Sequence, residues 1–112
     1  MEPIYSLETD SHAEAVRVRL AGEIDVSVAD EVHAALTKIV ADVQPDARTV
    51  ALDLSELQFI DSSGIRALLQ TVLDAQPADL AVSVVAVSDS VRRVLDIAGV
   101  SAMLGVEPDT GT

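Results

Sequence analysis

Two short segments near the start of the chain alternate apolar and polar residues, from Ile4 to Glu8 and from Ala15 to Leu20. Because successive side chains of a β-strand point to opposite faces, this period of two predicts two strands with one solvated face each. The residues between them, Thr9 to Glu14, are polar and predict a hairpin-like connection. We therefore expect the first two strands to pair in antiparallel fashion.

From Ser27 onward the apolar residues recur at steps of three and four, which is the period of an amphipathic helix. Ser27 is a candidate N-cap, and Pro45 with Asp46 is expected to end the helix. The predicted apolar stripe consists of Val28, Val32, Ala35, Leu36, Ile39 and Val43.

Two later segments, Arg48 to Leu54 and Leu80 to Val87, are almost continuously apolar, as is typical of strands covered by helices. Each is followed by a helical pattern. The second helix is predicted from Ile65, Leu68, Leu69, Val72 and Leu73, and the third from Val91, Val94, Leu95 and Ala98. Ser88 and Asp89 are candidate caps of the third helix, and Gly99 is a candidate terminator. The apolar residues Val100 to Val106 predict a last turn or short helix.

The predicted order is β-β-α-β-α-β-α with a short final element. Helical crossovers between the later strands imply parallel pairing, joined to the antiparallel opening pair. We therefore expect an α/β fold with a mixed sheet covered by helices. The 112 residues fit a single domain, residues 1–112, of which 107–112 are expected to fray.

The chain has no cysteine and a formal net charge of −12 at pH 7. Without cysteine there is no disulfide, thiolate metal site or thiol nucleophile, and we expect a cytoplasmic location. The negative charge repels nucleic-acid phosphates and anionic lipids, and no apolar run approaches ~20 residues. We expect binding neither to nucleic acid nor to membranes. The acidity has two open explanations, solubility alone or attraction to a basic patch on a protein partner.

Candidate chemistry is concentrated where the third strand gives way to the second helix. Asp61, Ser62 and Ser63 can all accept hydrogen bonds from the first turn of that helix, and Gly64 leaves its backbone unobstructed. Helix capping alone would explain these residues. A serine at the positive end of a helix dipole is also a suitable phosphoacceptor, because a phosphate finds N–H donors and favourable charge there.

A second acidic segment ends the second strand and leads into the first helix, at the same expected edge of the sheet. The motifs are G-E-I-D at Gly22 to Asp25 and D-S-S-G at Asp61 to Gly64. Together, and in this order, they resemble the two turns of the STAS domain family, and Val91 to Val100 is similar to the family's third-helix segment. Ile24 replaces the family's usual leucine, which is a conservative difference.

The resemblance implies a STAS fold, with a mixed sheet of four to five strands covered by three to four helices. It further implies a stand-alone bacterial anti-sigma factor antagonist. The family's phosphorylated serine falls on Ser62, with Ser63 as a structural cap. Residues expected to line the phosphorylation site and to bind the partner are Asp61, Ser63, Gly64, Glu23 and Asp25.

In the family the partner is an anti-sigma factor that is also a serine kinase. The unphosphorylated antagonist binds this kinase and frees the sigma factor, phosphorylation ends the complex, and a phosphatase restores it. ATP and magnesium belong to the kinase, so the resemblance implies no cofactor for this chain, which we expect to be a monomer when free. Ile24, Val26 and Val28 are either the apolar centre of the interface or part of the core.

Two rival interpretations remain. A hydrolase using Ser62 or Ser63 as nucleophile would need a base, yet His12 and His33 show no suitable spacing and no G-x-S-x-G motif exists. We therefore expect a non-enzymatic protein, with both histidines, Arg92 and Arg93 solvated. The other rival is a STAS scaffold that binds partners constitutively without phosphorylation, and the sequence leaves it open.

Overall fold

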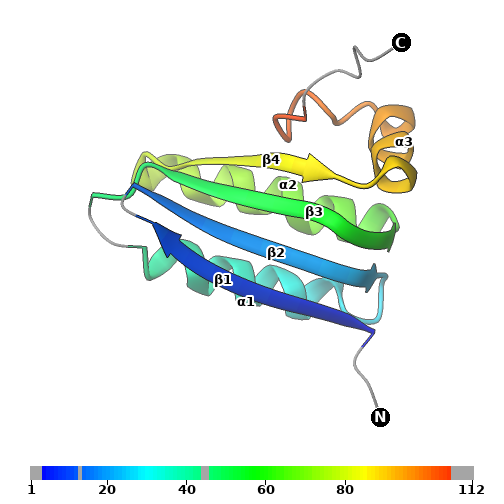
Figure 1. Cartoon of the computed structure of the whole chain (residues 1–112), viewed down its shortest axis with the longest axis horizontal. Helices are drawn as coiled ribbons and strands as arrows, with labels where there is room; N and C mark the ends of the chain where they lie inside the picture. Colours follow the sequence, from blue (N-terminus) through cyan, green and yellow to red (C-terminus); the bar gives the residue numbers. More distant parts are fainter. Residues whose placement is uncertain (1–3, 13, 44–45, 107–112) are drawn as a thin grey trace.

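The computed structural model describes residues 4–12, 14–43 and 46–106 (Figure 1). Its sheet has the strand order β1-β2-β3-β4. β1 pairs with β2 in antiparallel fashion, whereas β2, β3 and β4 run parallel to one another. The strands are β1 (Tyr5–His12), β2 (Ala15–Ile24), β3 (Thr49–Ile60) and β4 (Ala81–Val87). The predicted mixed α/β sheet is thereby confirmed.

Helices α1 (Ala29–Ala41) and α2 (Ser62–Ala75) lie side by side on one face of the sheet (Figure 1). A short 3-10 helix, η1 (Gln76–Ala78), follows α2, and α3 (Asp89–Ala98) lies beyond the carboxyl end of β4. Among the described residues, no helix covers the other face, which we call the open face. In the same part of the chain, no helix has the length and apolarity needed to span a membrane.

The core lies between the sheet and helices α1 and α2. Val16, Val18, Leu20 and Ile24 of β2 are buried there, because the side chains of a strand alternate between its two faces. The fully buried side chains of this core include Val18, Leu20, Ile24, Val32, Leu36, Leu52, Leu54, Leu57 and Leu68. The core is aliphatic, as expected from β-branched strands packed on leucine-bearing helices.

The predicted connection over Thr9 to Glu14 is wrong for most of its length. β1 continues to His12, which pairs with Ala15 of β2. Strand pairing uses backbone hydrogen bonds, so an edge strand can continue through polar residues that face water. The polar composition of this segment marks its exposure, not the end of the strand.

β3 ends six residues later than predicted, at Ile60 instead of Leu54, and begins one residue later, at Thr49. Its pairing with β4 ends at Leu54, but its pairing with β2 continues to Ile60, with two register shifts. Each shift lets polar residues enter the strand while Leu57 and Ile60 stay buried. The extension carries the ends of β2 and β3 to the same edge of the sheet.

The helix starts differ from the predicted ones in detail. Ser27 is not the N-cap of α1, which begins at Ala29 with Val28 in the cap position and no side-chain cap. Ser88 is the N-cap residue of α3, as predicted, but its hydroxyl donates to the carbonyl of Leu57 at 2.6 Å and makes no capping hydrogen bond. Gly99 ends α3 with a φ of 75°, as predicted for a left-handed C-cap.

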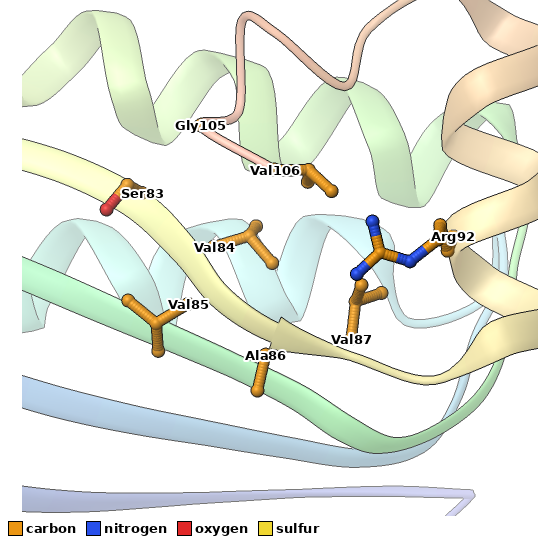
Figure 2. A pocket seen from close by; sticks show the side chains of 8 residues that line it. All are labelled: Ser83, Val84, Val85, Ala86, Val87, Arg92, Gly105 and Val106. Atoms are coloured by element: carbon orange, nitrogen blue, oxygen red, sulfur yellow. The ribbon is translucent and has the colours of Figure 1, made fainter. Parts of the chain in front are cut away.

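The last described segment, residues 100–106, forms turns that pack against β4, as expected for a short final element. The amide of Val84 donates to the carbonyl of Leu104 at 2.7 Å, and Leu104 and Val106 are buried. Figure 2 shows the hollow of about 300 Å³ that remains between this segment, β4 and α3. Arg92 lines this hollow and is half-buried, so its predicted full solvation is wrong, whereas Arg93 is exposed. The stripe predicted for α3 is also partly wrong, because Val94 and Ala98 are exposed.

Candidate functional site

Two turns leave the carboxyl edge of the sheet side by side. Ile24 at the end of β2 is paired with Ile60 at the end of β3, and both side chains are buried. After this pair of residues, the chain leads from β2 into α1 and from β3 into α2 (Figure 1). The G-E-I-D and D-S-S-G motifs therefore meet at one edge, as expected from parallel pairing.

Asp61 is the N-cap of α2, and both of its carboxylate oxygens are used. Oδ1 accepts hydrogen bonds from the amides of Ser63 at 3.0 Å and Gly64 at 3.1 Å, and from the Ser63 hydroxyl at 2.6 Å. Oδ2 accepts from the amide of Val26 at 3.1 Å, across a separation of 35 residues. The Ser63 hydroxyl and these amides lower the pKa of Asp61 against a smaller opposing effect of burial, so the carboxylate stays ionised.

Asp25 organises the turn before α1. Its Oδ1 accepts from the amide of Ser27 at 2.9 Å and from the hydroxyl of the same residue at 2.5 Å. Its carbonyl accepts from the amides of Val28 and Ala29. Ser27 is thus a donor within an aspartate turn, which explains why it does not cap the helix.

Ser62 is the first residue of α2, and its side chain is exposed. Within the described part of the chain, its hydroxyl has no hydrogen-bond partner. Ser63 differs from it, since it is half-buried and donates its hydroxyl hydrogen to Asp61. The capping acceptor is Asp61, so the cap role expected for Ser63 is corrected to that of a donor to the cap.

Gly64 lies where α2 approaches the end of the sheet most closely. A Cβ atom at this position would lie 2.6 Å from Cγ1 of Ile60 and 2.9 Å from Cγ2 of Ile24. Both contacts are shorter than real side chains tolerate. Glycine at this position therefore lets the first turn of α2, which carries Ser62, pack directly against Ile24 and Ile60 at the ends of β2 and β3.

Glu23 lies on the other side of the sheet from α2. It pairs with Phe59, while the alternating positions Ile24 and Ile60 face the helices, so Glu23 and Phe59 point to the open face. Both are exposed. The structure thus places Asp25, Asp61, Ser62, Ser63 and Gly64 around one edge, with Glu23 behind it.

The three apolar residues of this region separate into different environments. Ile24 is fully buried and Val28 packs partly against the core, whereas the side chain of Val26 is 77% exposed. Only Val26 of the three therefore presents a free apolar surface beside Ser62. Phe59, 46% exposed on the adjacent strand end, was not expected from the sequence.

His33 is not solvated as predicted. Its Nε2 lies 3.1 Å from Oδ2 of Asp74, which also accepts a hydrogen bond from Gln70. Asp74 lies in the last turn of α2, about 18 Å along the helix from Ser62 at 1.5 Å per residue. His33 is therefore in no position to serve as a base for Ser62. Among the described residues, no group of three or more His, Cys, Asp or Glu side chains is placed to hold a metal ion.

The link between Asp61 and Val26 is the feature of the site that sequence reasoning missed. The D-x-S spacing at Asp25 and at Asp61 is a usable signal for the two local turns, since aspartate often bonds the backbone two residues on. The link itself leaves no signal of this kind, because every residue other than proline carries the same amide donor.

Comparison with known proteins identifies the family of this chain. The family model "STAS domain" matches residues 6–112. The chain is 25% identical over 105 residues to the anti-sigma-B factor antagonist of Staphylococcus aureus strain NCTC 8325 / PS 47, covering 94% of each chain. The corresponding protein of Staphylococcus epidermidis gives the same values.

Solved structures show the same fold. A crystal structure of an anti-sigma factor antagonist from Mycobacterium paratuberculosis superposes with a TM-score of 0.78 and 25% identity, covering 95% of this chain and 87% of that chain. The anti-sigma factor antagonist SpoIIAA in its unphosphorylated form gives 0.71 and 21%, covering 88% and 84%. On the match of the family model over nearly its whole length, the chain belongs to the STAS domain family.

Proposed function

We propose that this protein is a cytoplasmic anti-sigma factor antagonist whose binding is switched by phosphorylation of Ser62. In the unphosphorylated form it binds an anti-sigma factor that is a serine kinase, and the sigma factor is released. The observation that carries the proposal is the exposed Ser62 hydroxyl at the start of α2, beside the carboxylates of Asp61 and Asp25. The related proteins, which are anti-sigma factor antagonists by name, support the same function.

The electrostatics of the site support the direction of the switch. A phosphate adds about −1.5 to −2 charges. Two first-turn donors of α2, the amides of Ser63 and Gly64, already bind Asp61, so they are not free to neutralise a phosphate as those of a bare helix end would be. The added charge is therefore left beside the carboxylates of Asp61 and Asp25, and it repels any acidic group of a partner that docks at this edge. One like-charge contact near 4 Å costs about 4 kcal/mol at an effective dielectric of 20 before screening.

The partner supplies what this chain lacks for the reaction. The kinase brings ATP and magnesium, the Ser62 hydroxyl receives the phosphoryl group, and a separate phosphatase removes it. Val26 is the apolar contact that we assign to the centre of the interface, because it is exposed between the two acidic turns. The free protein is proposed to be a monomer.

The test begins with capture of the kinase by the unphosphorylated protein from extracts of the source bacterium. The purified kinase and ATP are then incubated with wild type, Ser62→Ala and Ser63→Ala, and the products are analysed by intact mass spectrometry. We expect one phosphate on wild type and on Ser63→Ala, and none on Ser62→Ala. An unmodified wild type that still binds the kinase would overturn the switch and favour a constitutive scaffold.

A further inference from the structure

The turn before α1 and the start of α2 are joined by one side chain. Asp61 receives donors from both: Ser63 and Gly64 of its own helix bind Oδ1, and Val26 of the other turn binds Oδ2. In addition, the Asp61 amide donates to the carbonyl of Ile24 at 3.2 Å. Ordinary N-capping needs only one of the carboxylate oxygens. The second oxygen is thus available for a different task, and it is directed at the neighbouring turn.

Little else on the surface holds this turn against α2. The bonds made by Asp25 are internal to its own turn and to the start of α1. The Val26 side chain is 77% exposed, so packing does not anchor the residue. Beyond the backbone bond from Asp61 to Ile24, the amide of Val26 is therefore where, among the described residues, the turn carrying Asp25 is fixed relative to Ser62.

We propose that Asp61 is a positioning residue that links the Asp25–Ser27 turn to the start of α2. We call this link, the bond from the Val26 amide to Oδ2 of Asp61, the clasp. It forms the docking surface around Ser62 before the partner binds. The inference rests on the proposed function, because the surface it concerns is the one assigned to kinase binding. A preformed surface avoids the entropy of ordering a loop on association. Loss of the clasp therefore weakens docking, although Val26 and Asp25 themselves remain in place in the sequence.

Asparagine at position 61 separates the clasp from the cap. Asparagine caps helices about as well as aspartate, because its Oδ1 still accepts from the first-turn amides. Its other terminal group is NH₂, which only donates because its nitrogen lone pair is delocalised into the carbonyl, so it does not accept a hydrogen bond from the Val26 amide. Asp61→Asn thus keeps α2 capped and removes the link across the two turns. Asp89→Asn removes one carboxylate from the first turn of α3 and is the matched control for charge.

The first measurement is amide hydrogen exchange by NMR, which needs no partner. In Asp61→Asn we expect the Val26 amide to exchange about tenfold faster, with the Ser63 and Gly64 amides unchanged and the thermal midpoint close to wild type. In Asp89→Asn the Val26 amide keeps its wild-type rate. Unchanged exchange of Val26 in Asp61→Asn would overturn the clasp, and so would an equal acceleration at Ser63 and Gly64, which would indicate a lost cap.

The second measurement is the steady-state kinetics of Ser62 phosphorylation by the captured kinase. We expect Asp61→Asn to raise KM about tenfold with kcat nearly unchanged, and Asp89→Asn to leave both near wild type. A KM equal to wild type would overturn the role in docking. If the kinase does not bind the wild type at all, the proposed function fails, while the exchange of Val26 still decides whether the clasp exists.

Discussion

At the scale of single residues, Gly64 and Gly99 are required for different reasons. Gly99 adopts a φ of 75°, and an added Cβ would meet nothing within 4 Å. Gly64 sits in a regular helix, but its Cβ would collide with the buried side chains of Ile24 and Ile60. The first glycine is needed for backbone conformation and the second for packing at the site.

Gly64→Ala is expected to destabilise the protein by about 1 to 3 kcal/mol through overpacking, despite the higher helix propensity of alanine. Gly99→Ala, the control, is expected to cost about 1 kcal/mol through its left-handed conformation alone. Urea unfolding measures both, and NMR shifts of Ile24 and Ile60 should change only in Gly64→Ala. A free energy of unfolding equal to wild type in Gly64→Ala would contradict this, because it would mean that Ile24 and Ile60 accommodate the added methyl group without cost.

At the scale of elements, the open face of the sheet contains a buried carboxylate. Asp53 of β3 is only 3% exposed, and its Oδ2 lies 2.8 Å from Nη2 of Arg17 and 3.7 Å from Nε of Arg19 on β2. Burial raises the pKa of Asp53, but hydrogen bonds from the Ser55 hydroxyl and amide and from Arg17 outweigh it and lower the pKa to about 2. The contacts of Asp53 with Arg17 and Arg19 join β2 and β3 on the face that α1 and α2 do not cover, whereas the Ser55 bonds lie within β3.

The lowered pKa predicts a dependence of stability on pH. Because Asp53 has a lower pKa folded than unfolded, its carboxylate stabilises the fold above about pH 4, and this contribution is lost as the pH falls towards 2. With allowance for the half-exposed Arg17, we expect about 1 to 2 kcal/mol. The difference in unfolding free energy between wild type and Asp53→Asn should shrink from pH 5 to pH 2.5. An equal difference at both pH values would contradict this account.

Hydrophobic periodicity was sufficient to predict four strands, three helices and their order, because each element buries one face. It was insufficient for the strand ends. β1 continues through Thr9 to His12, and β3 continues past Asp53 and Ser55 to Ile60, since backbone pairing does not require apolar side chains. The start of α1 was misplaced because Asp25 engages Ser27 before the helix begins.

The candidate site was predictable to a similar extent. The motifs placed an exposed Ser62 at a helix start beside a second acidic turn, and the structure has both features. The bond from Val26 to Asp61 was beyond reach of the sequence, because it depends on a backbone amide that any residue other than proline would provide. Glu23 faces away from α2 because the side chains of β2 alternate, which the sequence shows only once the strand is known to continue to Ile24.

At the scale of the whole molecule, the net charge of −12 gives the site its context. A protein so acidic approaches a basic partner surface faster than a neutral one, and the gain falls with ionic strength. Ser62 lies at the start of a helix that packs on the sheet, so we expect the proposed switch to need no rearrangement of the fold. A phosphate on Ser62 then acts on the interface, through charge and size.

The most direct test is titration calorimetry of the captured kinase with two forms of this protein, one with serine and one with phosphoserine at position 62. Circular dichroism should give the same spectrum for both forms. The account predicts that the phosphorylated form binds at least about 100-fold more weakly, a loss of about 3 kcal/mol. Equal affinities of the two forms for the kinase would contradict it.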